Sequence, residues 1–143
     1  MSYVDGSLLP GEQVIFRTRL HWIIFLGPLL LFLIGVISLA VPKSAGFFLL
    51  VGLVSGLVAF IDYKTSEFAV TNKRVIVKVG VIRRRTLELQ LSKVETVAVN
   101  QGIIGRMLGY GNILITGTGG TKEPFNRISA PLELRRATQV GTT

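Results

Sequence analysis

The chain has 143 residues and a mass of 15.6 kDa, which is enough for one domain with an appendage. Hydrophobic residues make up 49% and charged residues only 17%, so the composition favours a protein that keeps part of its surface out of water. The net charge of +8 favours anionic partners, while the absence of Cys and the single His argue against disulfide scaffolds, zinc or iron–sulfur sites, thiol nucleophiles and His-dependent triads.

The first 22 residues are mostly polar and end with the pair His21-Trp22. We predict that residues 1–22 form a cytoplasmic N-terminal segment at a membrane interface, because aromatic side chains such as Trp22 are enriched there. No acidic residue is placed at a useful spacing from His21, so this histidine is not predicted to be catalytic.

Two uncharged apolar stretches follow, 23–41 and 45–61, and Pro42-Lys43-Ser44 connects them. As helices they would reach roughly 28 and 25 Å, against a hydrocarbon core of about 30 Å. A buried hairpin of a soluble protein would be amphipathic, whereas these stretches are apolar all round. A signal peptide would have a shorter apolar region after a short basic start. The pattern therefore predicts a transmembrane helical hairpin over residues 23–61.

The flanks of this hairpin are more basic than its tip. Arg17 and Arg19 precede the first stretch and Lys64 follows the second, whereas the tip carries only Lys43. Because excess Lys and Arg marks the cytoplasmic side, we expect a multi-pass protein of the cytoplasmic (inner) membrane with both termini in the cytoplasm.

The second apolar stretch contains Gly52 and Gly56 in a GxxxG pattern. Small residues at this spacing let membrane helices approach closely, either within one hairpin or in a dimer. We predict helix packing at these glycines, first of all within the hairpin. The pattern also contributes to our expectation of a homo-oligomer.

Residues 62–143 alternate between apolar and polar side chains in short runs, which is typical of half-buried strands. A change of parity between Val94 and Val97 indicates a bend, and Gly119-Gly120 indicates a hairpin turn. We predict five or six antiparallel strands in a small rolled sheet or partial barrel, followed by a short C-terminal helix over residues 131–139. The fold class is thus an α+β membrane protein with a helical hairpin and an antiparallel roll.

The run from Phe68 to Gly120, preceded by an apolar hairpin and by Leu9-Pro10-Gly11-Glu12, resembles the bacterial pleckstrin-homology-like (PH-like), membrane-flanked domain family. The matching features are Thr71, Lys73-Arg74, Gly80 and the stretch from Gln101 to Gly109-Tyr110-Gly111. The resemblance implies a PH-like antiparallel sheet with a C-terminal helix on the cytoplasmic face of the membrane. It implies no established activity.

Basic residues gather within and just after the second predicted strand. We predict contact with an anionic lipid leaflet for Lys73, Arg74, Lys78, Arg83, Arg84 and Arg85. Each Lys or Arg near such a surface gains about 1 kcal/mol. The alternative is that these positive residues only keep this part of the chain on the cytoplasmic side and form an ordinary solvent-exposed turn. Lys73 and Arg74 lie at the opposite end of their strand from Arg83–Arg85, so the two groups need not converge.

No motif for catalysis or for binding a cofactor, metal or nucleic acid is found. The segment Gly117–Lys122 lacks the spacing of a phosphate-binding loop, and Gly109-Tyr110-Gly111 lacks the third glycine of a dinucleotide fingerprint. Acidic residues are scattered, and aromatic residues are not interleaved with the basic ones as a single-strand binder requires. We therefore predict no enzyme, no cofactor and no nucleic-acid partner.

These expectations combine into a membrane-anchored PH-like module that binds proteins or associates with itself at the inner membrane. The interaction surface is predicted at exposed strand edges and at the polar faces around Arg74, Lys78, Glu88 and Gln90. Two alternatives stay open. One is a transport or channel component, although intramembrane charges commonly mark such paths and the two stretches carry none. The other is a domain that senses anionic lipid.

Overall fold

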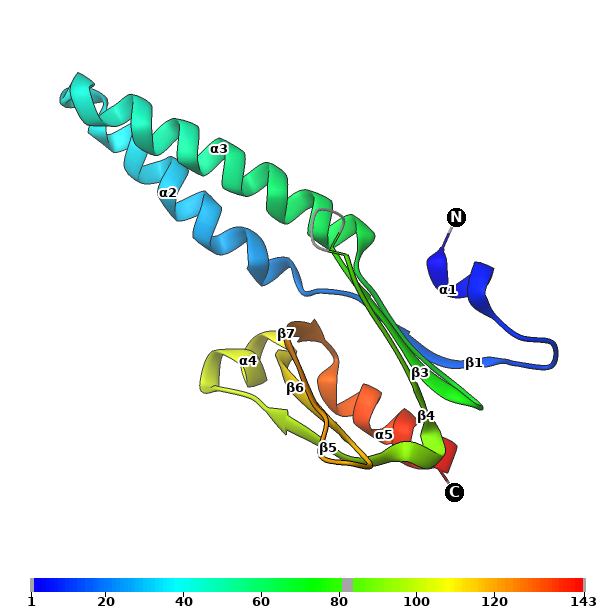
Figure 1. Ribbon diagram of the computed structural model, residues 1–143. Helices are drawn as coiled ribbons and strands as arrows, with labels where there is room; N and C mark the ends of the chain where they lie inside the picture. The colour runs from blue at the N-terminus through cyan, green and yellow to red at the C-terminus, as the bar shows by residue number, and fades with distance from the viewer. Residues whose placement is uncertain (1, 81–83, 143) are drawn as a thin grey trace. The chain divides into compact units, whose positions relative to one another are not determined.

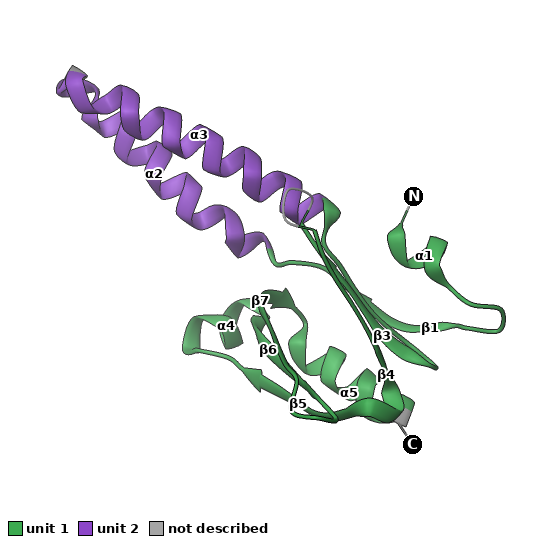
Figure 2. Cartoon of the chain, viewed as in Figure 1, with its two compact units in different colours: residues 1–21, 65–143 green, residues 22–64 purple. Residues whose placement is uncertain are grey.

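The computed structural model describes residues 2–80 and 84–142 (Figure 1). The chain divides into two compact units, one formed by Met1–His21 with Thr65–Thr143 and the other by Trp22–Lys64 (Figure 2). We call the first unit the roll and the second the hairpin. In sequence, the hairpin is an insertion within the roll.

The roll contains two antiparallel sheets in the described part of the chain, with strand orders β1-β2-β3-β4 and β5-β6-β7. The strands are β1 (Val14–Thr18), β2 (Glu67–Thr71), β3 (Arg74–Val79), β4 (Arg85–Gln90), β5 (Val94–Asn100), β6 (Tyr110–Gly117) and β7 (Lys122–Ser129). The predicted α+β fold with antiparallel sheets is confirmed, and the described residues form seven strands where the sequence indicated five or six.

The local signals in the sequence account for several of these strands. In β4 the polar side chains of Glu88 and Gln90 are exposed while Leu87 and Leu89, which alternate with them, are half-buried, as the alternation predicts. The β6–β7 turn contains Gly119 and Gly120 with φ values of 96° and 80°, a region that favours glycine. The register of β5 shifts just after Val94, where the parity change predicted a bend.

Strand β1 was not predicted, because residues 1–22 were assigned to a separate segment. In the structure β1 pairs antiparallel with β2, with Thr18 opposite Phe68. The strand is short and contains the charged Arg17, so its apolar pattern is too brief to stand out. The N-terminal residues before His21 thus belong to the roll.

The N-terminal helix α1 (Tyr3–Ser7) covers the outer face of the first sheet. Val4, Ala69 and Ile76 are fully buried there in a small second core. This corrects the prediction that β3 is half-buried, since the outward-facing Ile76 is as inaccessible as its neighbours in the main core.

The two sheets close around the main core, which contains Phe68, Val70, Val75, Val77, Ile113, Ile115, Phe125, Ile128 and Leu134. One corner is joined where Leu20 bridges to Ile128 and the Thr18 hydroxyl donates to the Ser129 carbonyl at 2.6 Å. At the other corner, the short 3₁₀ helix η3 (Leu91–Lys93) leads from β4 to β5. Helix α5 (Pro131–Thr142) packs against both sheets through Leu134 and Ala137 and is longer than predicted.

The hairpin consists of the 3₁₀ helix η1 (Trp22–Phe25), α2 (Leu26–Ile37), the 3₁₀ helix η2 (Ser38–Ala40) and α3 (Pro42–Thr65). The connector predicted at residues 42–44 lies earlier, because α3 begins at Pro42. Proline favours the first helical position, where its missing N–H has no intrahelical partner to lose. Helix α3 also continues past residue 61, and Lys64 in its last turn interacts favourably with the helix dipole.

Glycines let α2 and α3 approach each other closely. A Cβ atom at Gly52 would lie 2.8 Å from the backbone nitrogen of Phe32, and one at Gly35 would lie 2.8 Å from the backbone nitrogen of Leu49. A Cβ atom at Gly56 would meet only the Pro28 side chain, at an ordinary 3.7 Å. Of the two GxxxG glycines, Gly52 therefore makes the tight contact.

Both hairpin segments are long and apolar enough to cross a membrane, a test of length and composition only. The segments are Trp22–Ala40 and Lys43–Thr65, and in each window 11% of the residues are buried. Large side chains are exposed on both, including Ile37, Phe47 and Leu53 at 78%, 66% and 65%. The apolar surface of the hairpin is thus directed outward.

Candidate binding groove

The strand register gives the roll two distinguishable ends. At one end Thr18 lies opposite Phe68, and Glu67 lies opposite Lys78. The chain leaves the roll after His21 and returns at Thr65, so we call this the hairpin end. At the far end, β3 begins with Arg74 opposite the last residue of β4 and α5 finishes nearby.

A buried acid organises the far end. Gly11, with φ of 79°, makes a tight turn in which the Glu12 amide donates to the Leu9 carbonyl at 2.9 Å. The Glu12 side chain is fully buried and accepts hydrogen bonds from the Thr71 hydroxyl at 2.6 Å and from Arg74 Nε at 3.0 Å. The Leu9 amide donates to its other oxygen at 2.8 Å. This network fixes the N-terminal segment to the β2–β3 turn.

The network also shifts the titration of its members. Burial alone raises the pKa of Glu12, but the hydrogen bonds from the Leu9 amide, the Thr71 hydroxyl and the Arg74 guanidinium outweigh it and lower that pKa from 4.5 to about 2. The hydrogen bond to Glu12 in turn raises the pKa of Arg74. Both groups are therefore charged at neutral pH, and each compensates the other.

A groove of about 550 Å³ lies at this far end beside β4. It is lined by Leu9, Asn72, Lys73, Arg74, Glu88, Gln90, Leu91, Ser92 and Gly141. Among the lining residues, the Arg74 guanidinium donates to Glu88 Oε2 at 2.6 Å and to the Ser7 carbonyl at 2.5 Å. Among the described strands β4 pairs only with β3, so its other edge offers backbone donors and acceptors to an extended chain.

Of the six basic residues predicted to contact lipid, the five that the structure describes do not lie on one patch. Lys73 and Arg74 are at the far end, and Arg74 is already paired with Glu12 and Glu88. Arg83 lies outside the described residues. The contact of this set with a leaflet stays a prediction.

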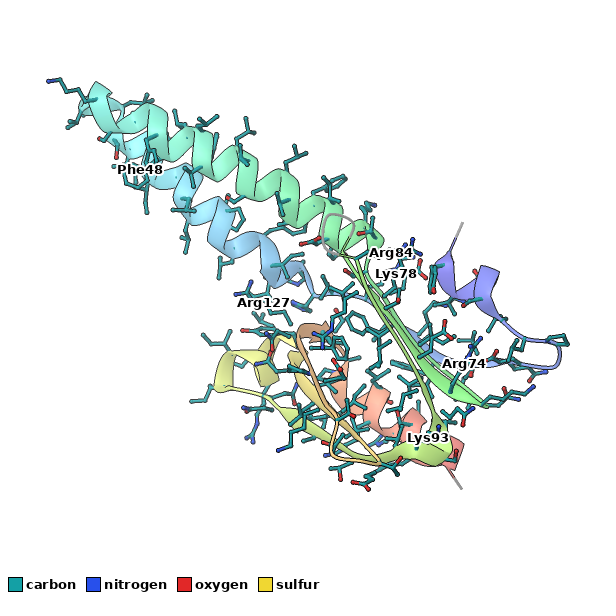
Figure 3. The ribbon with its side chains drawn as sticks, in the orientation of Figure 1. Phe48, Arg74, Lys78, Arg84, Lys93 and Arg127 are labelled. Carbon is teal, nitrogen blue, oxygen red and sulfur yellow. The ribbon has the colours of Figure 1, made fainter. Side chains whose placement is uncertain are left out.

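Lys78 and Arg84 lie close together (Figure 3). The pairing of Lys78 with Glu67 and of Arg85 with Val79 places this group at the hairpin end. Lys78 Nζ and Arg84 Cζ lie 5.3 and 5.2 Å from the centre of the Tyr3 ring, a cation–π arrangement. Arg85 forms an ion pair with Glu123 and lies 5.4 Å from the Phe125 ring. Lys78 and Arg84 thus share one aromatic platform, while the charge of Arg85 is compensated.

Sequence reasoning missed the roles of Glu12 and Tyr3. The signal for Glu12 was the Pro10-Gly11 turn followed by a single acid before a short strand, but burial of that acid depends on β1 pairing with β2. Tyr3 gave no signal, because its contacts with Lys78 and Arg84 join residues far apart in the chain.

In residues 2–80 and 84–142, no three acidic or histidine side chains gather closely enough to hold a metal ion. Two antiparallel sheets closed by a C-terminal helix, with a polar groove beside an open strand edge, define a PH-like fold with a candidate binding surface. Residues 18–140 match the sequence model of the family described as bacterial PH domain. The match covers most of the chain, so the chain belongs to the bacterial PH domain family.

Neither the curated proteins nor the solved structures give a match to this chain. PH-like domains are generally non-catalytic binding modules, so the family indicates a binding role. The resemblance identified from the sequence motifs is confirmed by this family match.

Proposed function

We propose that this protein is a membrane-anchored binding module. Its hairpin crosses the bacterial inner membrane, and its roll stands in the cytoplasm and binds an extended segment of another protein along β4. The module has no catalytic activity of its own in this proposal. The observation that carries it is the outward-directed apolar surface of the hairpin.

Exposure of that apolar surface to water would be energetically unfavourable. Ile37, Phe47 and Leu53 are all more than 60% exposed, and both helices are apolar around their whole circumference. Contiguous apolar surface of this kind marks a membrane or a partner interface. Two helices of about the thickness of a hydrocarbon core, joined by a short connector, suit a membrane best.

The pairing of β1 with β2 supports a topology with both flanks on one side. Thr18 precedes the first segment and Phe68 follows the second, yet they are partners in one sheet. The chain must therefore leave and re-enter the same compartment, which requires an even number of crossings. The flanks carry Arg17, Arg19 and Lys64 against Lys43 at the tip, and this charge bias favours the cytoplasm.

The binding part of the proposal rests on the groove and the edge of β4. Leu87 and Leu89 on this strand are only half-buried, and Glu88 and Gln90, which alternate with them, are exposed. An added strand would satisfy the open backbone groups, while alternate side chains would select the partner. The groove lies at the end of the roll opposite to the residues where the chain leaves for the hairpin and returns from it.

The topology can be tested with single cysteines, because the chain has none. We expect a membrane-impermeant maleimide to label Ser44→Cys, at the tip, from outside intact spheroplasts. Thr121→Cys, in the exposed β6–β7 turn, should be labelled only after the cells are opened. Labelling of both positions from the same side, or recovery of the intact chain in a detergent-free soluble fraction, would contradict the anchoring.

The binding surface can be tested with a photo-crosslinking residue at Gln90 in native membranes. Asn126, exposed on β7 of the other sheet, is the matched control. We expect a product of discrete mass from position 90 that position 126 does not give. A product of twice the chain mass would identify a second copy as the partner. Equal products from both positions would argue against β4 as the binding edge.

A further inference from the structure

Helix α4 (Ile103–Leu108) directs nearly all of its large side chains into solvent. Ile103 and Met107 are 81% and 80% exposed, and Ile104 and Leu108 are 61% and 40% exposed. Of the six residues of this helix, only Gly105 is buried. The helix is therefore an apolar projection from the roll, with four exposed large apolar side chains within six residues.

The projection is fixed firmly in place. Gly105 lies so close to Tyr110 that a Cβ atom would come within 2.6 Å of the Tyr110 carbonyl oxygen. The helix ends at Gly109, whose φ of 81° allows its amide to donate to the Gly105 carbonyl at 2.8 Å. The Gly109 carbonyl in turn accepts a hydrogen bond from the Ala130 amide. A glycine contact and two backbone bonds thus hold the apolar side chains outward.

His21, the last residue before the hairpin, is hydrogen-bonded to α4. The ring nitrogen Nε2 of His21 donates to the Leu108 carbonyl at 3.1 Å, and its ring lies 5.1 Å from that of Tyr110. The backbone amide of His21 donates to the Arg127 carbonyl at 2.8 Å. His21 is followed directly by Trp22, the first residue of the first apolar segment. One Cα–Cα step of about 3.8 Å separates the two residues.

The charges around α4 are mostly basic, with Glu133, which lines a pocket together with Arg106 and Gly109, as an acidic neighbour. Arg106 on the helix, Arg127 on β7 and Arg19 before His21 are all exposed, and the sequence from Gln101 to Tyr110 contains no acid. The Arg19 carbonyl accepts a bond from the Ser129 amide, so Arg19 and Arg127 flank the same corner of the roll. Apolar side chains beside guanidinium groups match the boundary between acyl chains and anionic headgroups.

We propose that α4 is a second membrane contact: it inserts Ile103, Ile104, Met107 and Leu108 into the headgroup–acyl boundary of the leaflet from which the hairpin starts. This inference rests on the proposed membrane anchoring. The occupant is lipid because the histidine that holds α4 is continuous with the start of the span, where Trp22 favours the interface. Insertion fixes the roll in orientation, with its groove turned toward the cytoplasm.

The test uses the full chain in vesicles of equimolar phosphatidylcholine and phosphatidylglycerol. Single cysteines at Met107, Thr121 and Leu53 carry an environment-sensitive fluorophore, one in each sample. Lipids with a spin label near the acyl carbonyls or in mid-chain quench from the membrane, and iodide quenches from water. We expect label 107 to be quenched several-fold by the shallow spin label and shielded from iodide, while label 121 shows the reverse.

Label 53 in α3 separates the two proposals. If it is quenched by mid-chain spin label while label 107 is as open to iodide as label 121, the α4 contact is wrong and the anchoring stands. If label 53 is not quenched by either lipid, the anchoring itself fails. Label 107 shielded from both lipid and iodide means that protein covers α4, and equal lipid quenching at 107 and 121 removes the specific role of this helix. Either result would overturn the inference.

Discussion

The roll and the hairpin place the same kinds of side chain in opposite surroundings. Phe68 in β2 is 1% exposed and stacks edge-on against Phe125, whereas Phe47 in α3 is 66% exposed. The roll also pairs its buried polar groups, as the Glu12–Arg74 network shows. The difference teaches that the core of the roll is completed by its own residues, while the hairpin needs an apolar surrounding that the chain does not provide.

The largest expected effect comes from removing the hairpin. Because Thr18 and Phe68 are opposite each other in one sheet, a short Gly-Ser loop can replace residues 22–64. We expect this variant to be soluble without detergent and to keep the strand signal of the roll. Size-exclusion chromatography and far-ultraviolet circular dichroism measure both properties. Aggregation of a roll that has lost its strands would show that the two units depend on each other.

Two matched phenylalanine substitutions sharpen the comparison. Phe68→Ala empties a packed site in the roll, and we expect it to lower the free energy of unfolding by about 3–5 kcal/mol. Phe47→Ala shortens an outward-facing side chain, with an expected change within about 0.5 kcal/mol. Guanidinium unfolding in mild detergent, followed by circular dichroism, measures both. A large loss for Phe47→Ala would mean that protein, not lipid or detergent, covers that face.

Much of the roll and the hairpin could be predicted because their signals are local. The alternation in Arg85–Gln90 and the Gly119-Gly120 turn each depend on neighbouring residues only. Strand β1 could not be predicted in this way. Its pairing joins residues about 50 positions apart across the hairpin, as in the contact of Thr18 with Phe68, and no local pattern records such a contact.

The candidate site shows the same division. Arg74, Lys78, Glu88 and Gln90 were identified as an interaction surface from their polar strand positions. Arg74, Glu88 and Gln90 line one groove, whereas Lys78 lies apart from it, against the Tyr3 ring. The ion pair of Arg74 with Glu12 was not predicted, because Glu12 comes close to Arg74 only when β1 pairs with β2. The exposed face of α4 was likewise missed, since a Gly-punctuated segment predicts a turn or a short helix but not which of its side chains remain uncovered.

The Glu12 network predicts a defined pH dependence of stability. The pKa of Glu12 falls from 4.5 to about 2 on folding, so the folded state favours the ionised acid. Its contribution is therefore fully present above pH 4.5 and is lost as the pH falls toward 2. We expect the guanidinium concentration at the unfolding midpoint of the loop-closed roll to decrease as the pH is lowered from 4.5 toward 2. In Glu12→Gln that part of the pH dependence should disappear, and an unchanged profile would contradict the assignment.

The two GxxxG glycines should respond differently to the same substitution. Gly52→Ala places a methyl group 2.8 Å from the Phe32 backbone, and we expect it to destabilise the hairpin by about 1–3 kcal/mol. Gly56→Ala meets only a side-chain atom at 3.7 Å and should be nearly neutral. Titration of the full chain from mild detergent into dodecyl sulfate measures the helical stability. The reverse order would indicate that these glycines pack against another chain.

The smallest expected effect concerns lipid contact by the two ends of the roll. Lys78 lies at the hairpin end with Arg84. Lys73 lies at the far end, next to Arg74, which is ion-paired with Glu12. If the hairpin end faces the leaflet, Lys78→Gln should weaken binding of the loop-closed roll to anionic vesicles by about fivefold, the equivalent of about 1 kcal/mol. Lys73→Gln removes the same charge and should change the affinity little. Vesicle co-sedimentation at low salt measures both.

The salt dependence of vesicle binding tests whether the difference between the two lysine variants is electrostatic. Contact between surface charges and a leaflet is screened within about 8 Å at physiological ionic strength, so the effect of Lys78→Gln should shrink as salt is raised. Equal losses for the two lysines would mean that the roll binds by net charge without a preferred end. A larger loss for Lys73→Gln would indicate that the groove end contacts the membrane, which would contradict the proposal that the groove binds a cytoplasmic protein.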